Sequence, residues 1–259
     1  MPRGLGLIVY GGEGMGKTTF ACQFPQPLTV FSIRETGFDD LYDVGLVPKE
    51  CSNYNVPNYA SLTQILSACT DKTIVIDSMS GFQQIFFEYL IQTLYEGNRT
   101  KFSSYSVGAR QDAPIMLLPL EAMLTEKRNK GQNVILLCHT KNEIGVNPLG
   151  ANFETLTPDM DKGIRGVFTK WAQAILFMNL EVNLQVATDT AWSEGKQVAL
   201  SGKAHNSTPN RLIYTEKAVG HSAKNRLGLP QYIPMGKSGP EAFTNFWKHV
   251  PSVYKNQPS

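Results

Sequence analysis

The sequence has 259 residues and a formal net charge of +2 at pH 7, with 42% hydrophobic and 18% charged residues. This length supports one large globular domain, and the near-neutral charge excludes a surface that is basic throughout, so any nucleic-acid site must be local. No apolar run is as long as a membrane span, and an apolar strand pattern starts close to the first residue, so we expect a soluble cytoplasmic protein without a membrane partner.

Apolar runs and helix-compatible runs alternate as far as Met178. Strands are expected at 5–10, 28–33, 53–56, 73–76, 133–138 and 171–178. Helices are expected at 18–24, 61–70, 83–95 and 115–128, with irregular segments at 97–113 and 141–157. Continuous apolar strands separated by helices predict an α/β fold, in which a mostly parallel sheet is covered by helices on both faces.

The pattern changes after residue 179. Shorter stretches at 181–187, 196–201 and 211–215 lie between turn-rich segments, which favours antiparallel strands at the edge of the sheet. A closing helix is expected at 241–249. We predict a single domain over residues 1–259, made of a core at 1–178 and a β-rich extension with the closing helix at 179–259.

The segment Gly11–Thr18 fits the phosphate-loop pattern G-x-x-x-x-G-K-[ST] at every fixed position, between an apolar strand and a helix-compatible run. Glycines let the backbone wrap a phosphate closely with its N–H groups pointing inward, and Lys17 reaches the β- and γ-phosphates. The alternative is a glycine-rich turn before a helix. We predict that ATP is bound by Gly11, Gly12, Glu13, Gly14, Met15, Gly16, Lys17, Thr18 and Thr19.

Asp77 ends the apolar strand expected at 73–76, where phosphate-loop enzymes place the carboxylate that holds Mg²⁺. We predict that Thr18 and Asp77 hold this ion. The alternative is that Asp77 only caps the helix that starts near Gly81. Residue 78 is Ser, whereas an AAA+ protein usually keeps its catalytic Glu directly after this Asp, so the AAA+ class is disfavoured.

Two further polar residues follow expected strands. Glu35 comes just after the strand at 28–33, and His139 ends the strand at 133–138. Because the carboxyl ends of parallel strands converge on a ligand, Glu35 can activate the attacking water and His139 can contact the γ-phosphate. The alternatives are an exposed loop glutamate and a histidine that satisfies a core hydrogen bond.

A late basic stretch holds Lys224 and Arg226, which would face the same side of a strand because they are two residues apart. Such a pair can clamp phosphate on a neighbouring subunit's nucleotide, as an arginine finger does. The alternative is a solvated basic turn.

Two segments that interrupt the regular pattern are candidate DNA-contacting surfaces. The segment 98–111 combines cations with aromatic residues, a composition typical of single-strand binding surfaces and equally of solvated loops. Its members are Arg99, Lys101, Phe102, Tyr105 and Arg110. The segment 141–165 carries Lys141, Lys162 and Arg165 but also acidic residues, so its charge argument is weaker.

The phosphate loop, Glu35, the strand ending at Asp77, the strand with His139 and the stretch 223–230 together resemble the phage-encoded RecA-like ATPases, including the Sak-type single-strand annealing proteins. The resemblance covers nearly the whole chain. Two departures are Arg34, where relatives have an acid or a small residue, and Leu227, where an aromatic residue is common.

The resemblance implies a RecA-like core, Mg²⁺-dependent ATP hydrolysis, assembly into rings or filaments, and single-stranded DNA as the partner, in the host cytoplasm if the protein is phage-encoded. It implies that Glu35 activates water, that His139 senses the γ-phosphate, and that Lys224 and Arg226 act as intersubunit or γ-phosphate cations. The predicted role is annealing or strand exchange in recombination or replication. Two alternatives stay open: a DnaB- or RadA-like DNA motor, and a non-motor ATP-dependent switch.

Overall fold

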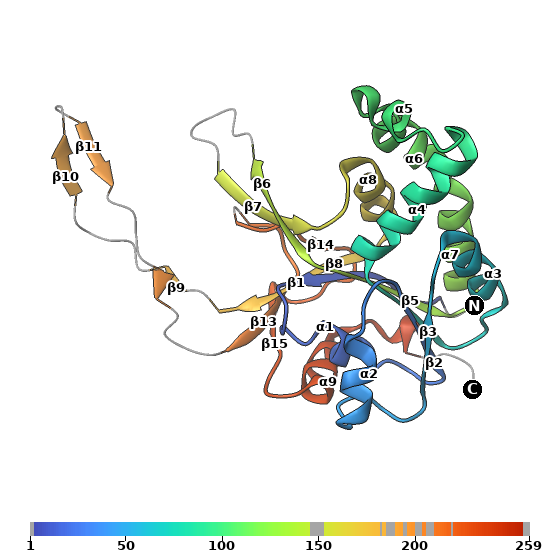
Figure 1. Cartoon of the computed structure of the whole chain (residues 1–259). Helices are drawn as coiled ribbons and strands as arrows, with labels where there is room; N and C mark the ends of the chain where they lie inside the picture. Colours follow the sequence, from blue (N-terminus) through green and yellow to red (C-terminus); the bar gives the residue numbers. More distant parts are fainter. Residues whose placement is uncertain are drawn as a thin grey trace.

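The computed structural model describes residues 3–145, 153–181, 183–184, 190–193, 196–199, 204–205, 210–218 and 220–255. Within them, the main sheet has nine strands in the order β15-β13-β8-β1-β5-β4-β2-β3, with β14 paired to β8 (Figure 1). The parallel strands are β1 (Gly6–Gly11), β2 (Leu28–Ser32), β3 (Cys51–Asn55), β4 (Thr73–Asp77), β5 (Asn133–Cys138) and β8 (Ala174–Leu180). The antiparallel strands are β13 (Arg211–Tyr214), β14 (Lys224–Asn225) and β15 (Tyr232–Pro234). The predicted α/β class is therefore confirmed, with a mostly parallel sheet and an antiparallel extension.

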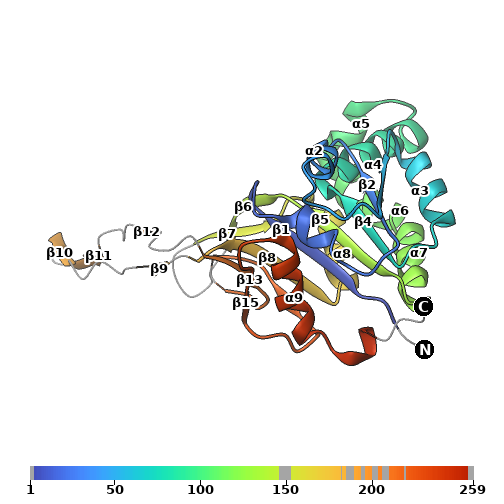
Figure 2. The same ribbon diagram turned by 90° about the horizontal axis from the view of Figure 1, so that it is seen from below.

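Helices cover both faces of the sheet, as Figures 1 and 2 show. One face carries α1 (Lys17–Ala21), α2 (Gly37–Asp43) and α9 (Gly239–His249). The other carries α3 (Tyr59–Ala68), α4 (Met79–Leu94), α7 (Leu118–Asn129) and α8 (Lys162–Trp171). Successive side chains of β1 point to opposite faces, so Val9 packs into the core with Phe20 and Ile8 packs into the core with Phe82.

The prediction of a long loop at 141–157 is wrong. β6 (Thr140–Gly145) and β7 (Phe153–Pro158) pair as an antiparallel hairpin that starts directly after His139. The hairpin lies outside the main sheet, and most of its side chains are exposed or half-buried. It therefore lacks the apolar alternation that marks a strand with one buried face.

The prediction of a strand at 171–178 is wrong at its start. Residues up to Trp171 form α8, and β8 begins only at Ala174. Ile164, Phe168 and Trp171 are buried along one face of α8, which is helical spacing.

The segment 97–113, expected to be irregular, is largely helical. It contains α5 (Arg99–Ser103), a 3₁₀ turn at Ser104–Ser106 and a π-helical turn at Gly108–Asp112, which leads into α6 (Ala113–Met116). The helix α2 (Gly37–Asp43) had no counterpart among the predicted elements. The closing helix is confirmed as α9.

The extension also contains short strand pairs outside the main sheet. β9 (Asn183–Leu184) pairs with β12 (Ala204–His205), and β10 (Thr190–Ser193) pairs with β11 (Lys196–Ala199). The strands predicted at 181–187 and 196–201 lie partly outside the described residues. In the part of the chain that is described, no helix has both the length and the apolar character needed to cross a membrane.

Candidate active site

The phosphate loop follows β1 directly and requires glycine at two points. Gly14 and Gly16 have φ of 70° and 86°, the left-handed region that side-chain-bearing residues seldom adopt. The Lys17 ammonium lies over the loop, where Nζ donates to the carbonyls of Gly11 at 3.0 Å and Gly12 at 2.8 Å. Burial lowers the pKa of this ammonium, because the charged form loses its hydration. The lysine is thus held where a phosphate oxygen would be a stronger partner than a carbonyl.

Asp77 lies beside the start of α1. Thr18 Oγ1 donates to Asp77 Oδ2 at 2.8 Å, which joins the end of β4 to the end of the phosphate loop. Burial raises the pKa of the Asp77 carboxyl, although the Thr18 hydrogen bond acts in the opposite direction. A hydroxyl and a buried carboxylate are hard oxygen donors, so the pair fits a Mg²⁺ ion. The alternative that Asp77 caps the next helix is wrong, since Ser78 accepts from the Gly81 amide as the N-cap of α4.

Glu35 and His139 lie together next to this pair. Glu35 Oε1 accepts from Ser78 Oγ at 2.7 Å and lies 3.0 Å from His139 Nε2. The three residues follow β2, β4 and β5, and these strands are neighbours in the sheet. About a third of the side chain of Glu35 is exposed, with 31% of its surface accessible, so the carboxylate can reach a bound water. The sequence analysis did not predict that Ser78 contacts Glu35.

Arg34 connects the turn that carries Glu35 to the helix α4. This residue has φ of 56°, and its guanidinium bonds to Glu88 at 2.8 Å and Gln84 at 2.9 Å on α4. Arg34 therefore points along α4 while Glu35 points to the strand ends. Arg34, at which the sequence departs from the RecA-like relatives, thus contacts α4 and not the strand ends.

Gly81 sets how closely α4 approaches this turn. A Cβ at this position would overlap the carbonyl oxygen of Ile33, two residues before Glu35. We expect Gly81→Ala to destabilise the fold by about 1–3 kcal/mol, because a backbone group must move, and to slow ATP hydrolysis by displacing Glu35. Denaturant unfolding and steady-state ATPase assays would measure both effects.

The matched control is Gly166→Ala in α8, where an added Cβ meets nothing within 4 Å. We expect this variant to be more stable than the native chain by about 0.5–1 kcal/mol, because alanine is the better helix former. Equal stability of the two variants would contradict the role given to Gly81.

Lys224 and Arg226 do not reach the phosphate loop of their own chain. Lys224 is opposite Ile175 near the start of β8, whereas Gly11 is opposite Met178 further along. Lys224 Nζ donates to the carbonyls of Thr169 at 2.5 Å, Lys170 at 3.2 Å and Ala172 at 2.6 Å, at the carboxyl end of α8. Cations there satisfy carbonyls that a helix end leaves unpaired.

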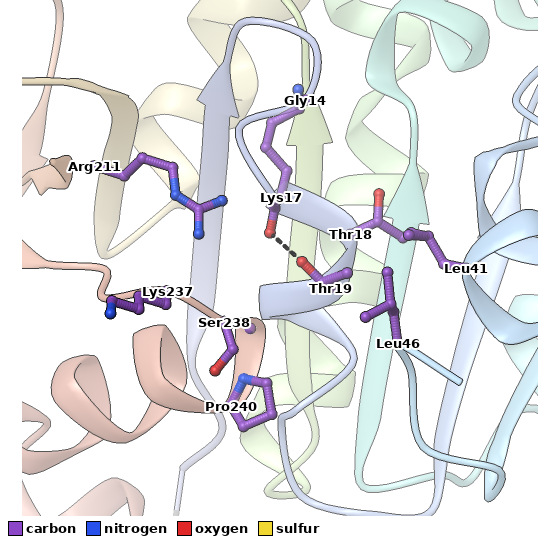
Figure 3. A pocket seen from close by; sticks show the side chains of 12 residues that line it. Gly14, Lys17, Thr18, Thr19, Leu41, Leu46, Arg211, Lys237, Ser238 and Pro240 are labelled. Atoms are coloured by element: carbon purple, nitrogen blue, oxygen red, sulfur yellow. Dashed lines mark hydrogen bonds between the residues drawn. The ribbon is translucent and has the colours of Figure 1, made fainter. Parts of the chain in front are cut away.

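Several residues that the sequence did not single out line a cavity of about 390 Å³ beside the phosphate loop (Figure 3). They come from the α2 region, from the start of β13, from the turn between β15 and α9, and from the first residues of α9. They are Leu41, Leu46, Arg211, Lys237, Ser238, Gly239 and Pro240. A cation at the start of a late strand carries no motif, so the sequence had no signal for Arg211.

The two candidate DNA segments differ in how accessible their side chains are. Tyr105 is 97% exposed, whereas Phe102 is buried against Phe87 and Tyr95. Phe102 is therefore a packing residue and cannot stack on a base as expected. In the second segment, Arg165 Nη2 pairs with Glu143 Oε2 at 2.7 Å, so its charge is already engaged.

Comparison with known proteins gives a family. No curated protein matches the chain. Among solved structures, the flagellar accessory protein FlaH from Methanocaldococcus jannaschii is similar at 12% identity and a TM-score of 0.44, with 90% of this chain and 85% of that chain covered. A family model described as an AAA domain matches residues 3–227. Ser78 after Asp77 led us to disfavour the AAA+ class, and the match to a model described as an AAA domain does not support that expectation. Because the match covers most of the chain, the protein belongs to the AAA domain family of P-loop ATPases.

Proposed function

We propose that this protein hydrolyses ATP with Mg²⁺ and acts on single-stranded DNA, as a phage-type RecA-like ATPase of recombination or replication. The observation that carries the proposal is the contact of Glu35 with Ser78 and His139, next to the Thr18–Asp77 pair. A carboxylate, an imidazole and a metal-binding pair beside a phosphate loop form a set suited to hydrolysis of a γ-phosphate.

The chemistry assigned to these residues is phosphoryl transfer to water. Glu35 orients the water and takes its proton as the water oxygen attacks the γ-phosphorus, and the bond to the β–γ bridging oxygen breaks. Lys17 neutralises charge on the β- and γ-phosphates. Thr18 and Asp77 would hold Mg²⁺, which would supply further charge neutralisation to the transferred phosphate. Ser78 and His139 fix the direction of the Glu35 carboxylate.

The hairpin β6–β7 supports a coupling between ATP hydrolysis and DNA binding, because it begins at the residue after His139. The Asp159 amide, just beyond β7, donates to the His139 carbonyl at 2.9 Å. Both ends of the hairpin are therefore tied to the candidate γ-phosphate sensor. Exposed Tyr105, with Arg99, Lys101 and Arg110 in the same segment, offers stacking and charge to a single strand.

Assembly into a ring or filament completes the proposal. Arg226 is exposed, and its guanidinium makes a 3.5 Å contact with the Lys170 carbonyl. In an oligomer, Arg226 and Lys224 would approach the nucleotide of a neighbouring subunit, because neither reaches that of its own chain.

The test is ATP hydrolysis without DNA, with single-stranded DNA and with duplex DNA. We expect stimulation by single strands only, and a loss of at least about 100-fold in the Lys17→Ala variant, because the charge on the phosphates is no longer neutralised. The control is Lys130→Ala, which removes an exposed lysine that pairs with Glu126 on the surface. Hydrolysis that does not depend on Lys17 contradicts the enzyme assignment, and hydrolysis that ignores single strands contradicts the DNA assignment. Strand displacement on a forked duplex would favour the motor alternative.

A further inference from the structure

Arg211 is placed beside the phosphate loop by the antiparallel extension of the sheet. β13 pairs with β8, and Arg211 is opposite Leu180, at the carboxyl end of β8. β8 in turn pairs with β1, so the first residue of β13 lies at the edge where β1 runs into the loop. In Figure 3 the Arg211 side chain extends from its strand toward the loop segment with Lys17.

The guanidinium is close to the loop backbone and is free to bind an anion. Arg211 Nη1 lies 3.4 Å from where a Cβ on Gly16 would be, which places the guanidinium directly beside the backbone of the phosphate loop. Nη2 makes a long contact of 3.4 Å with the Gly236 carbonyl, and none of the ion pairs found among the described residues involves Arg211. A half-buried arginine that lines a cavity beside the phosphate loop, and that has no carboxylate partner among the described residues, favours an anionic ligand there.

The position of Arg211 along the phosphate loop indicates which phosphates of the nucleotide its guanidinium can reach. The loop backbone cradles the α- and β-phosphates, whereas the lysine reaches the β- and γ-phosphates. Arg211 lies beside Gly16 and lines the cavity together with Thr18 and Thr19, away from Glu35 and His139. We propose that Arg211 binds the α- and β-phosphates of the nucleotide in its own chain, an inference that rests on the proposed nucleotide site.

This assignment separates two kinds of cation. Arg211 would act in every protomer, whether or not the chain assembles, because it belongs to the same chain as the loop. Lys224 is hydrogen-bonded to carbonyls at the carboxyl end of α8 and would act only across an interface. Arg211 is therefore a determinant of nucleotide affinity, and it does not discriminate ATP from ADP.

The test is direct binding of ATP and ADP to the full chain, measured by titration calorimetry for the native protein, Arg211→Gln and Arg211→Lys. We expect Arg211→Gln to weaken both nucleotides by the same factor, about 10- to 100-fold, because a charge-assisted hydrogen bond to phosphate is lost from both complexes. Arg211→Lys keeps the charge but not the fork of donors, so its loss should be smaller and again equal for the two ligands. Arg211→Lys also serves if the Gln variant does not fold.

The control is Lys248→Gln, which removes one positive charge from the exposed side of α9 and should leave both affinities unchanged. Unchanged affinity in the Arg211 variants would overturn the inference. A loss confined to ATP would also overturn it, because that result would place the guanidinium at the γ-phosphate. A native protein that binds neither nucleotide would instead overturn the proposed function itself.

Discussion

Replacement of Glu35 by glutamine is expected to lower the kcat of ATP hydrolysis by about 100- to 10,000-fold, because the attacking water loses its general base. The amide has nearly the shape of the carboxylate and can still accept the Ser78 hydroxyl, now 2.7 Å from Oε1. ATP affinity should therefore stay within a few-fold of the native value. Single-turnover hydrolysis and equilibrium ATP binding would separate the two effects.

The control for this prediction is Glu126→Gln. Glu126 is an exposed carboxylate near the end of α7 and pairs with Lys130. It precedes β5, whereas the candidate site lies at the carboxyl ends of β2, β4 and β5. This variant should hydrolyse ATP at the native rate, since exposed ion pairs of this kind contribute little. If Glu35→Gln also hydrolyses ATP normally, the base must be another group, and the contact with Ser78 and His139 is only structural.

Replacement of Asp77 by asparagine should affect activity and stability in opposite directions. Loss of the carboxylate should lower Mg²⁺-dependent hydrolysis by at least about 100-fold, because metal-assisted charge stabilisation amounts to several kcal/mol. The fold without nucleotide should be as stable as the native protein or more stable. Asp77 is buried, and asparagine keeps an acceptor for Thr18 without a charge to desolvate.

The pH dependence of this stability difference follows from the raised pKa of Asp77. Folding disfavours the ionised carboxylate above the pKa of the unfolded chain, so the native protein bears the penalty at neutral pH. The penalty disappears as pH falls through the raised pKa of the folded state, where the carboxyl is protonated. The advantage of the asparagine variant should therefore be largest at pH 7 and shrink in acid.

Thermal unfolding with a chelator and without nucleotide would measure the difference. The control is Asp43→Asn, at an exposed carboxylate near the end of α2, which should change stability by less than about 0.5 kcal/mol. A lower melting temperature for Asp77→Asn than for Asp43→Asn at pH 7 would show that the charge of Asp77 stabilises the apo fold, contrary to the expected penalty of its burial.

The strands that the sequence predicted correctly are those whose pattern lies within a few consecutive residues. β1, β4 and β5 are continuous apolar runs buried along their whole length, and the pattern for a covered parallel strand describes just such runs. The hairpin β6–β7 gave no such signal, because it stands outside the main sheet with most of its side chains half-buried or exposed. For α8, the buried positions Ile164, Phe168 and Trp171 had helical spacing, but Trp171 was assigned to the following strand.

The residues of the candidate site also fall into two groups, those with a local sequence signal and those brought together only by the fold. Gly11–Thr18 and Asp77 could be predicted from the sequence because a phosphate loop needs particular residues in consecutive positions, and the end of an apolar strand is recognisable locally. The order of strands in the sheet decided the rest. β2, β4 and β5 are neighbours, which brings Ser78 and His139 to Glu35, and β13 joins β8, which brings Arg211 to the loop while Lys224 pairs near the opposite end of β8. Such contacts join residues far apart in the chain and leave no periodic trace. The amino-acid sequence by itself therefore determined the phosphate-loop motif, and only the tertiary structure decided which side chains lie around it.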